Sequence, residues 1–380
     1  MISTHPLRLS WRDFVFYARV MGSIVSIGAV LTGGAVASLY IVKEHGRIVV
    51  GTTTTTPTGS ANIWMDTSGG TCTRSNTAVV YNDAAACGSL DAANDICQGG
   101  DIVRVKAGTY AQQDINGSGS GRSSSLRCTI TNAAGETAIF GCTPSTNNDG
   151  TTLQGTSCID VGKPTATSFL TFDGDLGGTC MVASCMRLKS QTYVFNGYTY
   201  QGRIDTERGD TFLTFNHMDV GSFTSAADDS AYTHNEIGPS TDPMNNRQAD
   251  GNRITWADNY IHDYEITSAT GHMECITYDA GLNVTITRNM FESCVVFGIF
   301  EKPTETVSGT ISNNAFWNPA GHTIQQDVKI SNLSGAPSCA TTVSNNWFSE
   351  GLLIDCPNAV DGGGNTDHSP TAQPPDPRLP

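Results

Sequence analysis

The densest group of chemically versatile side chains in the sequence lies between positions 262 and 279. If residues 272–276 form a strand, alternate side chains face opposite sides, so Met273 and Cys275 point into the core. His272 and Glu274 then project together onto the outer face. There, an imidazole beside a carboxylate can act as a base, bind a metal or hydrogen-bond a sugar. The alternative is a solvated pair on a strand surface. The titratable residues of this segment are His262, Asp263, Glu265, His272, Glu274 and Asp279.

The elements that must position these side chains recur along the chain. Each repeat has a polar residue, usually asparagine, with one apolar residue three positions before it and another two positions after it. Asparagine tolerates the left-handed conformation and so suits a sharp bend between strands, where stacked amides can hydrogen-bond along an axis. We therefore expect these asparagines to build the fold and not to catalyse. The repeats are Leu213/Asn216/Met218, Tyr232/Asn235/Ile237, Trp256/Asn259/Ile261, Ile286/Asn289/Phe291, Ile311/Asn314/Phe316 and Val343/Asn346/Phe348, with weaker members at Phe172/Asp175 and Phe195/Tyr198/Tyr200.

The spacing of the asparagines favours a coil of short strands over a helical repeat. Successive steps are 19, 24, 30, 25 and 32 residues. A coil tolerates this variation because extra residues loop out at one corner without disturbing the stack. One short helix is expected at residues 89–97, capped by Ser89 and ended by Gly99-Gly100. A strand follows at residues 101–105, and a turn is expected at residues 108–110.

The capping helix with its first coil, SLDAANDICQGGDIVRVKAGTY, and the NVTITRNMF-type repeats resemble a known group. They are similar to the right-handed parallel β-helix proteins of the pectate-lyase-like superfamily, including secreted bacterial members with no assigned reaction. The resemblance covers about residues 61–365 and implies an all-β solenoid with a short N-terminal capping helix. Because a fold does not determine a function, the chemistry has to be argued from the residues.

In such a β-helix a ligand groove runs along one sheet, and successive coils place residues on rungs about 4.8 Å apart. A lyase would use His272 or Lys302 as its base, with carboxylates holding Ca²⁺. A glycoside hydrolase would instead use two carboxylates, for which Glu274 and Glu301 qualify. The candidates are His272, Glu274, Glu301 and Lys302 for catalysis, Asp250 and Glu274 for calcium, and Arg253, His262, Asp263, Tyr264 and His322 for substrate binding.

Whether the protein is an enzyme stays open at this stage. Asp228-Asp229 and Gly271-His272 match parts of the β-helix polygalacturonase motifs, but Met273 replaces the second glycine of Gly-His-Gly, and Arg-Ile-Lys is absent. The expected function is to bind an extracellular polysaccharide, with cleavage by β-elimination or hydrolysis as an open option. The alternative is a non-catalytic cell-surface adhesin or a structural display module.

The composition narrows the set of partners. The 380 residues include 36 Asp and Glu and 21 Lys and Arg, a net charge of −15. Charged residues make up 15% of the chain, which is too few for a coiled coil. Nucleic-acid binding is driven by basic side chains that release counterions from the phosphate backbone. Because a chain this acidic does not release them, nucleic acid is excluded as a partner. The chain would repel an acidic glycan unless a cation such as Ca²⁺ bridged the two, so a Ca²⁺-assisted acidic glycan and a neutral glycan both fit.

The N-terminal segment indicates export. No charged residue lies between Arg19 and Lys43, and Ala35-Val36-Ala37 follows the apolar core as a cleavage site would in a signal peptide. The stretch is also long enough to remain as a membrane anchor, which would be the only membrane contact. Both options predict a secreted or cell-surface protein. The predicted organisation is residues 1–43 as signal peptide or anchor, 44–61 as a Thr-rich linker, 62–365 as the β-helix and 366–380 as an extended Pro-rich tail.

The 12 cysteines are an even number and fit disulfides formed in an oxidising compartment. The sequence has no Cys-x2-Cys motif, which makes a structural metal site a weaker interpretation. Spacing alone does not determine connectivity, so proximity in sequence supplies only candidate pairs. These are Cys72–Cys87, Cys128–Cys142, Cys180–Cys185, Cys275–Cys294 and Cys339–Cys356.

Overall fold

The structure of the protein is a computed structural model. It describes residues 15–21, 24–30, 36–44, 47–54, 59–117, 119–136, 138–141, 143–146, 153–162, 165–174, 192–195, 198–201, 203–207, 209–239, 251–264, 274–301, 303, 305–319, 326–332, 338–369 and 372–378. The chain divides into two units, residues 1–59 and Ser60–Pro380.

The N-terminal unit is an antiparallel sheet. Its strands follow the chain in the order β1 (Val15–Met21), β2 (Ile24–Val30), β3 (Val36–Glu44) and β4 (Arg47–Thr54). Within the described residues, no helix is long and apolar enough to span a membrane. The signal peptide or anchor at residues 1–43 stays a prediction, and β4 occupies part of the segment expected as a linker.

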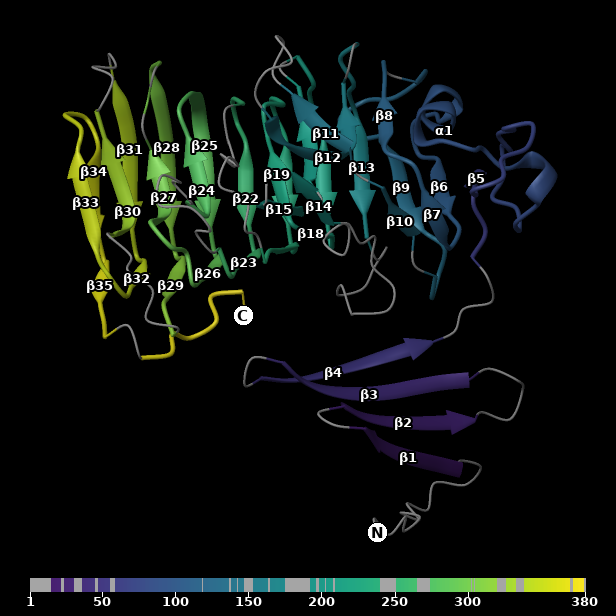
Figure 1. The fold of residues 1–380 in the computed structure, drawn as a ribbon, viewed down its shortest axis with the longest axis horizontal. Coiled ribbons are helices and arrows are strands. Elements are labelled where there is room, and N and C mark those ends of the chain that lie inside the picture. Colours follow the sequence, from purple (N-terminus) through teal and green to yellow (C-terminus); the bar gives the residue numbers. More distant parts are fainter. Residues whose placement is uncertain are drawn as a thin grey trace. The chain divides into compact units, whose positions relative to one another are not determined.

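The second unit is a right-handed parallel β-helix, as the sequence predicts (Figure 1). Sheet A is the longest and contains, in spatial order, β5 (Ile63–Met65), β6 (Ile102–Val105), β9 (Cys128–Asn132), β13 (Leu170–Asp173), β17 (Thr214–Asn216), β20 (Ala231–Thr233), β22 (Thr255–Ala257), β25 (Gly281–Thr287), β28 (Val307–Ser312), β31 (Cys339–Ser344) and β34 (Val360–Gly363).

Two further parallel sheets complete the C-terminal coils. Sheet B contains β18 (Asp219–Val220), β21 (Glu236–Ile237), β23 (Tyr260–His262), β26 (Met290–Glu292), β29 (Ala315–Trp317), β32 (Trp347–Phe348) and β35 (Thr366–Asp367). Sheet C contains β24 (Ile276–Tyr278), β27 (Phe297–Glu301), β30 (Gln326–Ser331) and β33 (Leu352–Asp355). Strand β35 shows that sheet B extends into the segment expected as a tail.

The N-terminal coils use other strands on their third side. A sheet there contains β8 (Gln113–Ile115), β11 (Thr143–Thr146), β12 (Leu153–Val161), β16 (Arg203–Thr206) and β19 (Ser222–Thr224). The expected turn at residues 108–110 is instead strand β7 (Gly108–Tyr110), which pairs with β10 (Ala138–Phe140) because Gly108–Tyr110 belongs to the second side of the first coil. The weak repeat at residues 195–200 is an antiparallel hairpin of β14 (Thr192–Phe195) and β15 (Tyr198–Gln201), not a coil.

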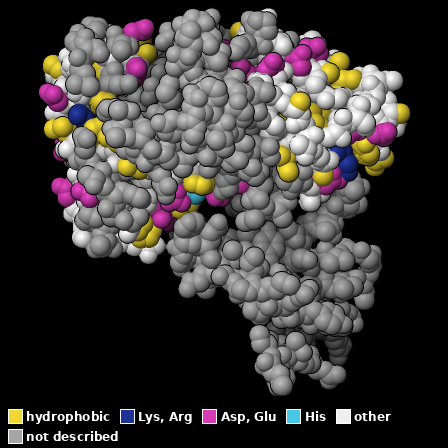
Figure 2. Space-filling view, viewed as in Figure 1, with side chains coloured by type: hydrophobic (Ala, Val, Ile, Leu, Met, Phe, Trp, Pro, Cys, Tyr) yellow, Lys and Arg dark blue, Asp and Glu magenta, His cyan; other side chains and the backbone are white. Residues whose placement is uncertain are grey.

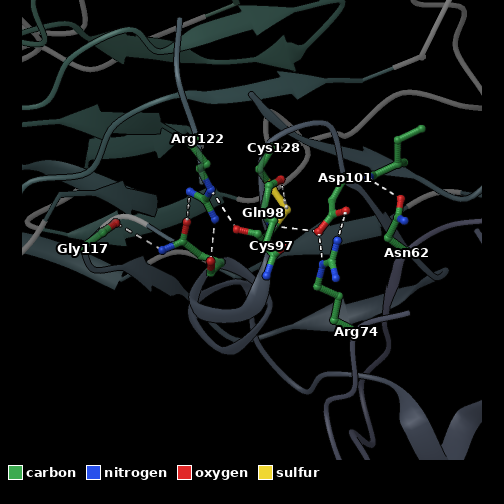
Figure 3. The surroundings of a disulfide bond; sticks show 10 residues. Asn62, Arg74, Cys97, Gln98, Asp101, Gly117, Arg122 and Cys128 are labelled. Atoms are coloured by element: carbon green, nitrogen blue, oxygen red, sulfur yellow. Dashed lines mark hydrogen bonds and ion pairs between the residues drawn. A yellow bond between two sulfur atoms is a disulfide. The ribbon is translucent and has the colours of Figure 1, made fainter. Parts of the chain in front are cut away.

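The N-terminal end of the solenoid is capped as expected. Helix α1 (Leu90–Ile96), which follows the short helix η1 (Asp83–Ala85), begins at Ser89, whose side chain accepts a hydrogen bond from the amide of Ala92. Beside the cap, the guanidinium of Arg74 pairs with the buried Asp101 at 2.5 Å and 3.0 Å (Figure 3).

The interior consists of side chains stacked in register. The rings of Phe172 and Phe215 are 5.1 Å apart, those of Phe215 and Tyr232 are 5.2 Å apart, and those of Tyr232 and Trp256 are 4.7 Å apart. All of these side chains are fully buried. These separations match the spacing of neighbouring strands, so the aromatic rings of successive coils stack along the core in this part of the solenoid.

The repeated asparagines form a buried ladder from Asn235 to Asn365. Each Nδ2 donates to Oδ1 of the next asparagine at 2.9–3.1 Å, and each such Oδ1 also accepts the backbone N–H of the asparagine before it. The ladder therefore ties each coil to the next at the corner between sheets A and B. Its members are Asn235, Asn259, Asn289, Asn314, Asn346 and Asn365.

Two details of this corner differ from the prediction. The left-handed residue is the one before each ladder asparagine, as at Asp258 and Arg288, so the asparagine contributes hydrogen bonds and not its tolerance of positive φ. Asn216 is not in the ladder, because β17 pairs it with Thr233. Met218 takes that place, and its amide donates to Asn235 Oδ1 at 2.9 Å.

Three of the five predicted disulfides are confirmed: Cys72–Cys87, Cys275–Cys294 and Cys339–Cys356. The pairing of Cys128 with Cys142 is wrong, because Cys128 is bonded to Cys97 (Figure 3). Helix α1 ends at Cys97 above the start of β9, which brings the two Cα atoms to 6.0 Å, within disulfide reach. Cys142, Cys180 and Cys185 lie outside the described residues, so the pair Cys180–Cys185 stays a prediction.

Candidate functional site

The residues on the outer face of sheet B occupy fixed positions relative to the ladder asparagines. The residue two positions after each ladder asparagine points into the core, as the buried Ile261, Phe291 and Phe316 show. Because side chains alternate along a strand, the residues one and three positions after each asparagine face outward. In the order of the coils, these outward residues include Glu236, Tyr260, His262, Met290, Glu292, Ala315, Trp317, Trp347, Thr366 and His368.

Apolar and aromatic side chains on this face form an outer cluster that is separate from the core. Tyr260, Met290 and Ala315 are its buried members, and Trp317 and Trp347 pack against them. The register of β23, β26, β29 and β32 places Tyr260, Met290, Ala315 and Trp347 in one row along the solenoid axis. The outer face of sheet B is therefore apolar along a line that crosses several coils.

Aromatic rings are also stacked on this face. The ring of Trp347 lies 4.3 Å from that of His368 with an interplanar angle of 7°. The ring of Tyr260 lies 4.3 Å from that of His262 with an interplanar angle of 10°. Flat aromatic rings provide the type of surface on which the apolar faces of sugars pack.

A polar group surrounds His262 at one end of the outer cluster. Its Nδ1 lies 2.9 Å from Asp263 Oδ2 and its Nε2 lies 3.5 Å from Glu236 Oε1. Burial opposes the charged form of His262, but the hydrogen bonds to Asp263 and Glu236 outweigh it and raise the pKa of the imidazole. His262 and Asp263 were both predicted to bind substrate, and the structure brings them together on this face.

Glu292 completes this acidic end of the cluster. The hydroxyl of Tyr260 donates to Glu292 Oε2 at 2.7 Å. Burial and this hydrogen bond raise the pKa of Tyr260, and the nearby charges of Asp263 and Glu236 add to the effect. The phenol therefore keeps its proton, and three carboxylates lie around one tyrosine and one histidine.

The C-terminal segment, residues 372–378, returns to this face. In Figure 1 the chain leaves β35 and turns back towards the strands that precede it. The guanidinium carbon of Arg378 lies 5.1 Å from the centre of the Tyr260 ring. Arg378 also donates to both oxygens of Asp376 at 2.8 Å. Pro374 of the same segment is buried.

A second row of polar side chains follows the corner between sheets A and B and was not predicted. His217 Nδ1 lies 3.1 Å from Asp173 Oδ1, and the rings of His217 and His234 are 5.3 Å apart. Burial lowers the pKa of His234. Arg288 donates to both oxygens of Asp258 at 2.8 Å and 2.7 Å. The last pair fits a structural role for Arg288, which directly precedes ladder residue Asn289.

Glu301 is not on an outer face, although it was predicted as a catalytic residue. Its position in β27 is aligned with Tyr278, and both side chains are fully buried. The Tyr278 hydroxyl donates to Glu301 and lies 3.2 Å from Thr341 Oγ1. Burial raises the pKa of Glu301 to about 7, although hydrogen bonds from Tyr278 and Thr341 oppose the shift.

Glu274 and Tyr264 also lie away from solvent. Cys275 is buried, as the strand alternation predicted, but Glu274 is buried too, at 2% exposure, and is not a solvated surface residue. The strand begins only at Ile276, so alternation does not govern the position of Glu274. Tyr264 is fully buried, and its hydroxyl donates to the carbonyl of Gly221 at 2.9 Å.

Arg253 lies at a different corner of the solenoid, before sheet A begins. It donates to the two oxygens of Asp229 at 2.5 Å and 2.8 Å. A hollow of about 250 Å³ next to it is lined in part by Asp228, Asn252 and Glu305. Asn252 Nδ2 donates to Asp228 at 3.1 Å and 3.2 Å, so the polar groups of the hollow bind mainly to one another.

Four predicted site residues lie outside the described residues: Asp250, His272, Lys302 and His322. Their roles, and the catalytic pair of His272 with Glu274, stay predictions. Of the parts of the chain that the structure describes, none brings together three His, Cys, Asp or Glu side chains that could hold a metal ion.

Acidic side chains outnumber basic ones on the visible face of the described residues (Figure 2). Figure 2 shows Asp and Glu side chains along the described parts of the visible face, whereas Lys and Arg are confined to a few places. This distribution agrees with the net charge of −15.

Comparison with known proteins gives two distant structural likenesses. No protein-family model and no curated protein matches the chain. Among solved structures, it is similar to XylC in complex with xylose, with 11% identity, 80% of this chain and 68% of that chain covered, and a TM-score of 0.48. It is also similar to a family 28 exopolygalacturonase from Yersinia enterocolitica, with 11% identity, 91% and 73% covered, and a TM-score of 0.40. The parallel β-helix fold of this chain is shown by its own sheets.

Proposed function

We propose that the protein binds an extracellular polysaccharide along the outer face of sheet B. The observation that carries this proposal is the outer cluster, in which Tyr260 and Trp347 lie in one row along the solenoid axis and Trp317 lies in the row beside it. A chain of sugars can pack its apolar ring faces on such a row while its hydroxyl groups reach nearby polar side chains.

The polar side chains at the end of the row can accept hydrogen bonds from the hydroxyl groups of a sugar. Glu236, Asp263 and Glu292 offer acceptor oxygens, and His262 lies between two of these carboxylates. Their negative charge would repel a glycan rich in carboxylates. The face therefore favours a neutral or a basic glycan over an acidic one.

Cleavage is a separate matter from binding. His262 could exchange a proton with a bound sugar, since its imidazole is flanked by Asp263 and Glu236. The proposal is restricted to binding, which the aromatic side chains of the outer cluster support. Its test also detects any cleavage.

The location outside the cytoplasm rests on the disulfides. The described residues include the bonds Cys72–Cys87, Cys97–Cys128, Cys275–Cys294 and Cys339–Cys356. Disulfides persist in oxidising compartments, which is where extracellular polysaccharides are encountered.

The test is isothermal titration of the full chain with a panel of neutral, basic and uronate-containing oligosaccharides. We expect a neutral or basic glycan to bind, and Trp347→Ala and Trp317→Ala each to weaken its affinity about tenfold, the effect of losing one stacked ring. Leu353→Ala is the control, because Leu353 is exposed on sheet C. Unchanged affinity in both tryptophan variants would contradict the proposal. New reducing or unsaturated ends in the mixtures would reveal cleavage.

A further inference from the structure

The contact between Arg378 and Tyr260 joins two parts of the chain that are far apart in the solenoid. Tyr260 lies on β23, and the strands β26, β29 and β32 separate it from β35, where the sheet ends. Four strand spacings of about 4.8 Å amount to roughly 19 Å, which an extended segment of ten residues covers easily. This length is sufficient for residues 372–378 to bring Arg378 to Tyr260.

The place that Arg378 reaches is suited to a positive charge. Tyr260 offers the face of its ring, its hydroxyl is bonded to Glu292, and its neighbour His262 is bonded to Asp263 and Glu236. A cation over an aromatic face is stabilised by the ring's electron distribution, and nearby carboxylates strengthen the attraction. On the described part of the outer face, Arg378 supplies a positive charge over the ring of Tyr260.

The contact is built so that it can be released. Arg378 is paired with Asp376 of its own segment, at 2.8 Å for both hydrogen bonds, so the guanidinium keeps a partner when it leaves the ring. Its side chain is 28% exposed, which shows that it is not locked in the core. A single cation–π contact at such a site is a weak attachment.

We propose that Tyr260, with Glu236, Asp263 and Glu292, forms a subsite for the ammonium group of an amino sugar, and that Arg378 occupies this subsite within the same molecule. This inference rests on the proposed glycan-binding function and specifies its ligand as a polysaccharide with free amines. The C-terminal segment then competes with the ligand, and the glycan has to displace Arg378 to bind fully.

The experiment compares two ligands of equal length, an oligomer of glucosamine and its fully N-acetylated counterpart, below the pKa of the free amines. Affinities are measured for the unmodified full chain, Arg378→Ala and Tyr260→Leu. Arg253→Ala is the matched control, because Arg253 is also exposed and paired with an aspartate but lies at another corner. Thermal unfolding of every variant verifies that it is folded.

We expect Arg378→Ala to bind the glucosamine oligomer about tenfold more tightly than the unmodified chain, with less than a twofold change for the N-acetylated oligomer. Tyr260→Leu should remove the preference for the free amine. Equal affinity of Arg378→Ala for both oligomers would overturn the ammonium subsite. No gain in Arg378→Ala would overturn the competition by the C-terminal segment.

Failure of this inference is distinguishable from failure of the proposed function. If a neutral glycan binds in a manner that depends on Trp347 while neither the amine nor Arg378 matters, the inference is wrong and the glycan-binding face remains. If Trp347→Ala leaves the binding of every glycan unchanged, the proposed function itself is wrong.

Discussion

Asn259 donates a hydrogen bond from Nδ2 to Oδ1 of Asn289 at 2.9 Å, and this one bond aligns both the core and the outer face of two coils. The residue after each of these asparagines, Tyr260 and Met290, enters the outer cluster, while Ile261 and Phe291 enter the core. A change in the ladder would therefore disturb the candidate site as well as stability.

The first prediction concerns the ladder itself. In Asn289→Ala the Oδ1 atom of Asn289 is missing, and this atom accepts hydrogen bonds from both Nδ2 and the backbone N–H of Asn259. These two buried donors then lose that partner. We expect the free energy of unfolding to fall by about 3 kcal/mol, measured by urea denaturation. The control is Asn313→Gly, because Asn313 has a φ of 55° that glycine adopts readily and is exposed. A loss no larger than that of the control would count against the ladder.

The second prediction concerns the disulfide that the sequence missed. Digestion of the non-reduced protein should yield a peptide pair joined through Cys97 and Cys128, detected by mass spectrometry. Cys128→Ser should lower stability by about 2–4 kcal/mol, because the loop between the two residues is no longer closed in the unfolded state. Under reducing conditions the difference between the variant and the unmodified chain should disappear. A peptide joining Cys128 to Cys142 would contradict the structure.

The third prediction concerns the buried acid in the core. Because burial raises the pKa of Glu301 from 4.5 to about 7, the folded state binds the proton more tightly than the unfolded state. This contribution to stability is fully present below pH 4.5 and is lost as the pH rises through 7, a change of about 3 kcal/mol.

Glu301→Gln should therefore unfold at a higher temperature than the unmodified chain at pH 8, with the advantage shrinking towards pH 4.5. Glu305→Gln is the control, since Glu305 is exposed. If Glu301→Gln shows the same dependence on pH as the unmodified chain, Glu301 is not a protonated core residue.

The fourth prediction concerns His262. Its raised pKa means that its interactions with Asp263 and Glu236 stabilise the fold below the unfolded pKa of 6.5 and weaken as the pH rises through the folded value. Glu236→Gln should lower the pKa of His262, which titration by NMR of the imidazole measures. His234, whose pKa is lowered by burial and which lies on another face, should keep its value. An unchanged pKa of His262 would show that Glu236 does not interact with it in solution.

The β-helix could be predicted from the sequence because each coil needs apolar residues for the core and a residue that bonds it to the next coil. Both requirements recur along the chain as a pattern of residue types. The asparagines at Asn235, Asn259, Asn289, Asn314 and Asn346 were placed correctly, and Ser89 begins the capping helix as expected. Asn216 was misplaced because an apolar residue, Met218, holds the ladder position in its coil, so the pattern of residue types shifts by two there.

The candidate site was harder to predict, for two physical reasons. Acidity and density of titratable residues selected Glu274 and Glu301, but a carboxyl can be buried with a hydrogen-bonding partner such as Tyr278, which composition does not show. The signal for the outer face was available, since alternation after each asparagine places Tyr260 and His262 outside. The contact from Arg378 could not be predicted, because it depends on the path of the C-terminal segment.

The central claim is that the outer face of sheet B binds the glycan, and hydroxyl-radical footprinting of the full chain tests it most directly. With the tightest-binding oligosaccharide present, we predict that oxidation of Trp317 and Trp347 falls severalfold while oxidation of Leu353 on sheet C stays unchanged. Protection at Leu353 with full oxidation of both tryptophans would contradict the account.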